Sequence, residues 1–74
     1  MNNEMIQPSI KWWYVIDRYG AMRGDGKAGK VVSRHRSHRN ATLAADRQTI
    51  PETHCRVVNG QFINIDPTGF AYWR

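Results

Sequence analysis

A single cysteine, Cys55, most limits how this chain can become stable, because one thiol cannot form an intrachain disulfide. The chain has 74 residues, and a domain of this size buries only about 60% of the surface that its unfolded form exposes. It must therefore fold on a small hydrophobic core. The lone cysteine also favours a reducing compartment.

The termini and the apolar runs bear on where the protein resides. No apolar run approaches the roughly 20 residues that cross a bilayer, so no membrane partner is expected. The beginning of the chain, MNNEMIQPSIK, lacks the charged start and the hydrophobic stretch of a secretory signal. We therefore expect a cytoplasmic protein.

Residues 10–17, IKWWYVID, are typical of a strand because they are aromatic and β-branched. The even positions of this segment are all apolar and are predicted to face the core: Ile10, Trp12, Tyr14 and Ile16. The odd positions are mixed, which leaves Trp13 half exposed. Residues 1–9 are polar and contain Pro8, so they predict a flexible N-terminal arm before a single domain over residues 10–74.

Residues 18–29 contain four glycines and predict a long loop, after which residues 30–36, KVVSRHR, predict a second strand. Alternation gives this strand two sides, one with Val32, Arg34 and Arg36, and the other with Val31, Ser33 and His35. If Val31 faces inward, two arginines lie in a row on the outward side.

A helix is predicted over residues 37–48. Ser37 or Asn40 can cap it, since either side-chain oxygen can accept a backbone N–H of the first turn. Three alanines fall on one face at helical spacing and let the helix lie close to a sheet: Ala41, Ala44 and Ala45.

The last third of the chain contains two turn signals. Asn59-Gly60 between two apolar runs predicts a two-residue hairpin turn, because both residues tolerate positive φ. Residues 66–69, DPTG, predict a second turn, and residues 70–74, FAYWR, a short edge strand. The order β-β-α-β-β, with this fifth short strand, predicts an α+β fold: a small, mostly antiparallel sheet with one helix packed on one face.

Motifs for catalysis and metal binding fail on their context. Gly24, Gly26 and Gly29 spell the dinucleotide fingerprint, but a strand follows them where that motif needs a helix, so a flexible hairpin loop is expected. His54 and Cys55 are adjacent, and neighbouring strand residues face opposite ways, which suits neither a metal site nor a catalytic pair. The acids occur singly. We expect no enzyme, no metal and no cofactor.

The positive charge is concentrated in one segment. The whole chain carries a formal charge of +5, whereas residues 18–39 contain seven Lys or Arg and one acid. The predicted contacts to nucleic acid are Arg34, Arg36, Arg39, Lys27, Lys30, His35 and His38. Aromatic residues that can stack on bases or line an interface are Trp13, Tyr19, Tyr72 and Trp73.

This asymmetry predicts a small accessory protein that binds a DNA or RNA backbone through the basic junction between the second strand and the helix. The alternative is a phage- or plasmid-type inhibitor or adaptor whose aromatic and basic residues bind an acidic surface of a host protein. A homodimer is a further alternative, since a chain this small gains stability from pairing an exposed strand edge.

Overall fold

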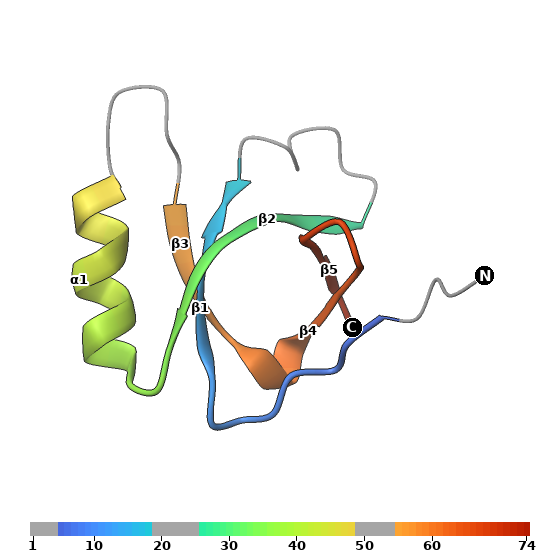
Figure 1. Cartoon of the computed structure of the whole chain (residues 1–74), viewed down its shortest axis with the longest axis horizontal. Helices are drawn as coiled ribbons and strands as arrows, with labels where there is room; N and C mark the ends of the chain where they lie inside the picture. Colours follow the sequence, from blue (N-terminus) through green and yellow to red (C-terminus); the bar gives the residue numbers. More distant parts are fainter. Residues whose placement is uncertain (1–4, 19–25, 49–54) are drawn as a thin grey trace.

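The computed structural model describes residues 5–18, 26–48 and 55–74, which form one five-stranded antiparallel sheet and one α-helix (Figure 1). The elements in chain order are β1 (Trp13–Asp17), β2 (Lys27–His35), α1 (His38–Gln48), β3 (Cys55–Asn59), the 3-10 helix η2 (Gly60–Phe62), β4 (Ile63–Ile65) and β5 (Phe70–Trp73). The strands lie side by side in the order β3-β1-β2-β5-β4. The predicted α+β class is confirmed, and the strand order differs slightly from the predicted one, since the expected C-terminal edge strand lies inside the sheet.

The sheet curls because β2 is long and bent. One half of β2 pairs with β1 and the other half with β5, and the register shifts once in each pairing, as at a β-bulge. Bulges bend a strand and increase its twist, and Figure 1 shows β2 curving across the molecule. At Gly29, which has φ +140°, a Cβ would clash with the backbone of Asp17, so only glycine permits this approach.

Two small cores lie on opposite faces of the sheet. Inside the curl, buried residues of all five strands pack together: Tyr14, Ile16, Ala28, Val58, Ile63 and Ala71. On the other face, the fully buried Val15 packs against Ala41 and Ala45 of α1. The strand β1 is therefore buried on both faces, and it is the element that joins the two cores.

Helix α1 begins as predicted. The Ser37 hydroxyl accepts a hydrogen bond from the backbone N–H of Asn40 at 3.1 Å, so Ser37 is the capping residue. Ala41 and Ala45 are buried and Ala44 is partly buried against the sheet, which confirms the predicted alanine face.

The first predicted strand is correct in part. Tyr14 and Ile16 are in the core, Trp12 packs against it and Trp13 is half-buried, as expected. Ile10 is wrongly placed by the alternation, because 62% of it is exposed. The chain turns before β1, where the Trp12 N–H donates to the Ser9 carbonyl, so the strand pattern does not reach back to residue 10.

The alternation and the loop predicted around β2 also need correction. The strand begins at Lys27, so residues 27–29 belong to the sheet, while the predicted loop positions 19–25 lie outside the described residues. Ile16 pairs with Val31 and Val15 with Ser33, which leaves the bulged Val32 without a partner on β1. Val31 therefore faces the same core as Ile16, on the side of the sheet that also carries Arg34.

The hairpin predicted at Asn59-Gly60 is wrong. Strands β3 and β4 lie at opposite edges of the sheet and are joined by η2. Asn59 has φ −73° and its side chain caps η2, accepting from the Gln61 N–H at 3.1 Å and donating to the Ile10 carbonyl at 2.9 Å. The asparagine joins this connection to the segment that precedes β1.

The C-terminal strand is present but is not an edge strand, because β5 pairs with both β2 and β4. The turn before it is as predicted, with the Gly69 N–H donating to the Asp66 carbonyl and Gly69 at φ +94°. Of residues 1–9, residues 5–9 are described. They run along the outer side of β4, where Ile6 and Ile65 exchange backbone hydrogen bonds of 2.7 and 2.9 Å.

The first prediction concerns Asn59. The substitution Asn59→Ala removes both side-chain hydrogen bonds of a buried residue, and we expect it to lower the free energy of unfolding by about 1–3 kcal/mol. Asn40→Ala, at an exposed helix position, is the matched control and should change it by less than about 0.5 kcal/mol. Equal effects in urea denaturation would contradict the capping role of Asn59.

The second prediction concerns pH. Hydrogen bonds from Thr68, Phe70 and Tyr72 hold the pKa of Asp66 below its usual value, the Thr68 hydroxyl contributing most. A lowered pKa in the folded state stabilises the protein above the unfolded-state pKa, and this contribution disappears as the pH falls through the folded-state pKa. The stability difference between wild type and Asp66→Asn should therefore shrink below about pH 4. Thermal melts from about pH 7 to about pH 2 measure it, and a constant difference would contradict it.

Candidate functional site

Two arginines of the basic segment lie against one tryptophan. The guanidinium carbon of Arg34 is 4.2 Å from the centroid of the Trp12 ring, and that of Arg36 is 4.8 Å away. Tyr14 pairs with Arg34, so Arg34 is on the same face of the sheet as Tyr14, the face inside the curl. The same register brings residue 36 beside residue 12. Both distances are within the range of cation–π attraction. We call Trp12, Arg34 and Arg36 the Trp12 cluster.

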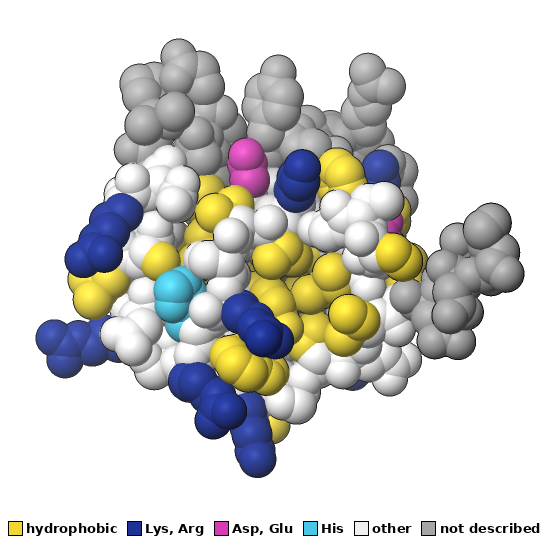
Figure 2. Space-filling view, in the orientation of Figure 1, with side chains coloured by type: hydrophobic (Ala, Val, Ile, Leu, Met, Phe, Trp, Pro, Cys, Tyr) yellow, Lys and Arg dark blue, Asp and Glu magenta, His cyan; other side chains and the backbone are white. Residues whose placement is uncertain are grey.

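The charges of the Trp12 cluster are not neutralised by the part of the protein that is described. Arg34 and Arg36 are exposed, and neither contacts a carboxylate among residues 5–18, 26–48 and 55–74. Because each lies so close to the same ring, the two guanidinium carbons are no more than about 9 Å apart. Figure 2 shows Lys and Arg side chains gathered beside hydrophobic ones near the lower edge of the face of the molecule in view.

The junction between β2 and α1 only partly matches the expected basic ridge. Arg39 is exposed in the first turn of α1, three residues after Arg36. The exposed His38 makes an edge contact with Trp13, their ring centroids 4.9 Å apart. His35 pairs with Trp13, on the face of the sheet that packs against α1, and lies 2.9 Å from the Ser33 hydroxyl. It is therefore turned away from the Trp12 cluster.

The two predicted lysines form a second, separate group. The ammonium nitrogens of Lys27 and Lys30 are 4.8 and 6.0 Å from the centroid of Phe70. Lys30 pairs with Asp17, the neighbour of Ile16 along β1, so it is on the opposite face of the sheet from Ile16 and Arg34. The lysines and the arginines therefore do not form one continuous surface.

The aromatic residues expected at an interface have different environments. Trp13 is half-buried in the core beneath α1, and the half-buried Tyr72 donates its hydroxyl to Asp66 at 3.2 Å. Tyr19 lies outside the described residues. Trp73 is 43% exposed, and the guanidinium of Arg56 lies 5.3 Å from the centroid of its ring.

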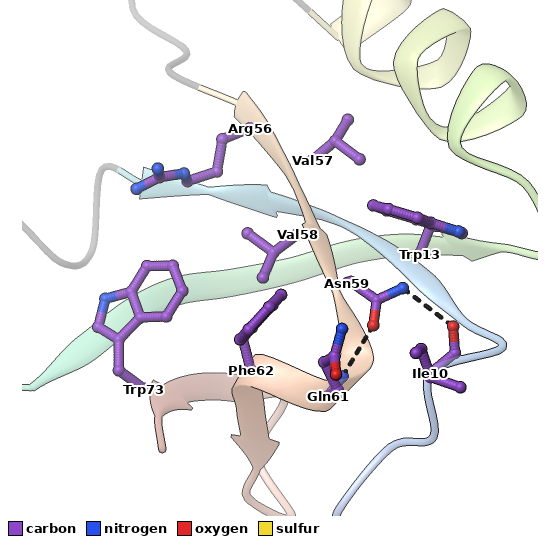
Figure 3. Close-up of a pocket in the computed structure, with 9 residues that line it drawn as sticks. All are labelled: Ile10, Trp13, Arg56, Val57, Val58, Asn59, Gln61, Phe62 and Trp73. Atoms are coloured by element: carbon purple, nitrogen blue, oxygen red, sulfur yellow. Dashed lines mark hydrogen bonds between the residues drawn. The ribbon is translucent and has the colours of Figure 1, made fainter.

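Trp73 lines an open groove of about 410 Å³ that sequence reasoning did not predict (Figure 3). The residues that line the groove are Ile10, Trp13, Arg56, Val57, Val58, Asn59, Gln61, Phe62 and Trp73. Phe62 and Ile10 are 56% and 62% exposed. No local pattern reveals this groove, because β3 and β5 meet there only through the curvature of the sheet.

The structure bears on two of the candidate chemistries, the Cys55 thiol and metal ligation. Burial raises the pKa of the Cys55 thiol, with a further contribution from the negative charge of Asp17. The thiol is therefore a weak nucleophile near neutral pH. Among the residues with described positions there is no group of three His, Cys, Asp or Glu side chains able to hold a metal ion. None of the described helices has the length and apolar character needed to cross a bilayer.

The third prediction tests the contact between Arg34 and Trp12. In a double-mutant cycle of Arg34→Ala and Trp12→Leu, we expect a coupling energy of about 0.5–1 kcal/mol, the usual strength of an exposed cation–π pair. The parallel cycle of Arg18→Ala with Trp12→Leu should be additive, because Arg18 follows the last residue of β1 whereas Trp12 precedes the first. Unfolding in urea gives the four free energies of each cycle. Additive behaviour of the Arg34 pair would contradict the contact.

Comparison with protein-family models, with curated proteins and with solved structures found no match for this chain.

Proposed function

We propose that the protein binds the phosphate backbone of nucleic acid through the Trp12 cluster. The observation that carries this proposal is the pair of exposed guanidinium groups held on one ring without a carboxylate partner among the described residues. A guanidinium presents several N–H donors in a rigid fork that matches phosphate oxygens. Packing on Trp12 restricts both side chains, so less conformational entropy is lost when a phosphate is bound.

The chemistry of the cluster favours the backbone over the bases. Sequence is read by side chains that reach base edges in a groove, usually from a helix or a two-stranded ribbon. Here the arginines lie at the end of a sheet strand, beside the first turn of α1 and its exposed Arg39. We therefore expect binding with little dependence on base sequence, and Arg39 as a third contact to phosphate.

The wider charge of the chain supports the same proposal. The formal charge is +5, which attracts a polyanion before contact and speeds association. Lys27 and Lys30 are outside the Trp12 cluster. We propose that they contribute to this long-range attraction and do not contact the phosphates bound by the arginines. His35, turned toward the helix side, is not assigned a contact.

The fourth prediction is a salt-dependent affinity. Arg34→Ala with Arg36→Ala should weaken binding to labelled single-stranded and duplex DNA, and it should reduce the slope of log K against log salt by about 1.4 to 1.8. The reason is that two fewer phosphates are neutralised, so fewer counterions are released. Fluorescence anisotropy at several salt concentrations measures both quantities.

The matched control is Arg18→Ala with Arg47→Ala. It removes the same charge from exposed positions at the far ends of β1 and α1. This variant should keep most of the slope of the wild type. Absence of binding at low salt, or equal losses in the two double variants, would overturn the proposal.

A further inference from the structure

The strand β3 has an open edge. It lies at one end of the sheet and pairs only with β1 among the described strands. The Gly60 N–H donates to the Trp12 carbonyl at 2.8 Å, and the register from there along β3 is regular. Since backbone groups alternate in direction along an antiparallel pair, those of Cys55, Val57 and Asn59 point away from β1.

The groove runs along this open edge. Four consecutive residues of β3 line it, from Arg56 to Asn59. Val57 belongs to the face that packs on α1 and Val58 to the interior of the curl. Because successive residues of a strand face opposite sides of the sheet, a groove lined by four consecutive residues lies beside the edge of the strand. Figure 3 shows Arg56 and Val58 on the side toward Trp73 and Phe62.

The side chains that line the groove indicate which kind of ligand it can bind. Its far side is formed by Trp73 and Phe62, which are 43% and 56% exposed. Among the described residues, Arg56 is the one ionisable side chain that lines it, and it contacts the Trp73 ring but no described carboxylate. The groove thus presents a row of backbone donors and acceptors, an apolar wall and a positive charge that no carboxylate of the described part of the chain neutralises.

We propose that an extended peptide segment of a partner protein, with an acidic side chain among apolar ones, binds as an added strand on the open edge of β3. Main-chain hydrogen bonds to Val57 and its alternate neighbours give such binding its affinity, and the side-chain sites beside them give specificity. The acidic side chain pairs with Arg56, and an apolar one packs between Phe62 and Trp73. A second copy of this chain, with its charge of +5, is a less suitable occupant.

The fifth prediction uses a displayed library of random nine-residue peptides, selected on the full chain. The peptides recovered should share an acidic residue and an apolar residue two positions away, because side chains of a strand recur on one side every second residue. Arg56→Glu should weaken their binding by at least about tenfold, since it replaces attraction with repulsion. The control Arg47→Glu makes the same charge change on α1 and should leave binding within about twofold.

Two further measurements test whether the peptide pairs with the edge of β3. N-methylation of every second backbone nitrogen of the peptide should abolish binding for one of the two alternating sets of nitrogens and not for the other. Hydrogen exchange of the Val57 amide should slow in the complex. Arg34→Ala with Arg36→Ala should leave peptide affinity unchanged, so failure here is distinguishable from failure of nucleic-acid binding. Recovered peptides that bind the Arg56→Glu variant equally well, or a dimer in sedimentation that blocks the edge of β3, would overturn the proposal.

Discussion

The fold depends on the bend in β2, because this one strand pairs with β1 at one end and with β5 at the other. A flat sheet of these short strands would leave both faces poorly covered. The bulges and Gly29 let the sheet curl until side chains of β1, β3, β4 and β5 meet in one interior, while α1 covers the outer face of β1. A chain of 74 residues thereby builds two cores that share a strand.

Features set by neighbouring residues could be predicted from the sequence. The capping by Ser37, the buried alanine face and the turn beginning at Asp66 each depend on side chains within four residues. The role of Asn59 could not be predicted in this way. Its side chain bonds to Ile10, 49 positions away, and that contact outweighs the local preference of Asn-Gly for a hairpin turn. Distant pairing likewise makes the C-terminal strand internal.

The Trp12 cluster likewise depends partly on local sequence and partly on pairing between distant residues. The concentration of charge identified Arg34 and Arg36, but alternation alone gave Trp12 only a core role. Once Tyr14 is paired with Arg34, residue 12 must lie beside residue 36, so the register of one hairpin was the missing information. The groove required more, since it depends on the curvature that brings Trp73 toward β3. Bulges set that curvature, and a sequence pattern does not locate them.

The open edge of β3 also bears on colloidal behaviour. Unpaired strand edges associate with one another unless charge or geometry opposes it, and here Arg56 lies on the edge strand itself, in a chain of charge +5. Mutual repulsion between copies opposes association of these edges. Screening by concentrated salt, or neutralisation by a bound polyanion, removes this repulsion. If the protein binds an anionic ligand as proposed, the same positive charge serves two ends: it attracts the ligand and opposes edge-to-edge association of unliganded copies.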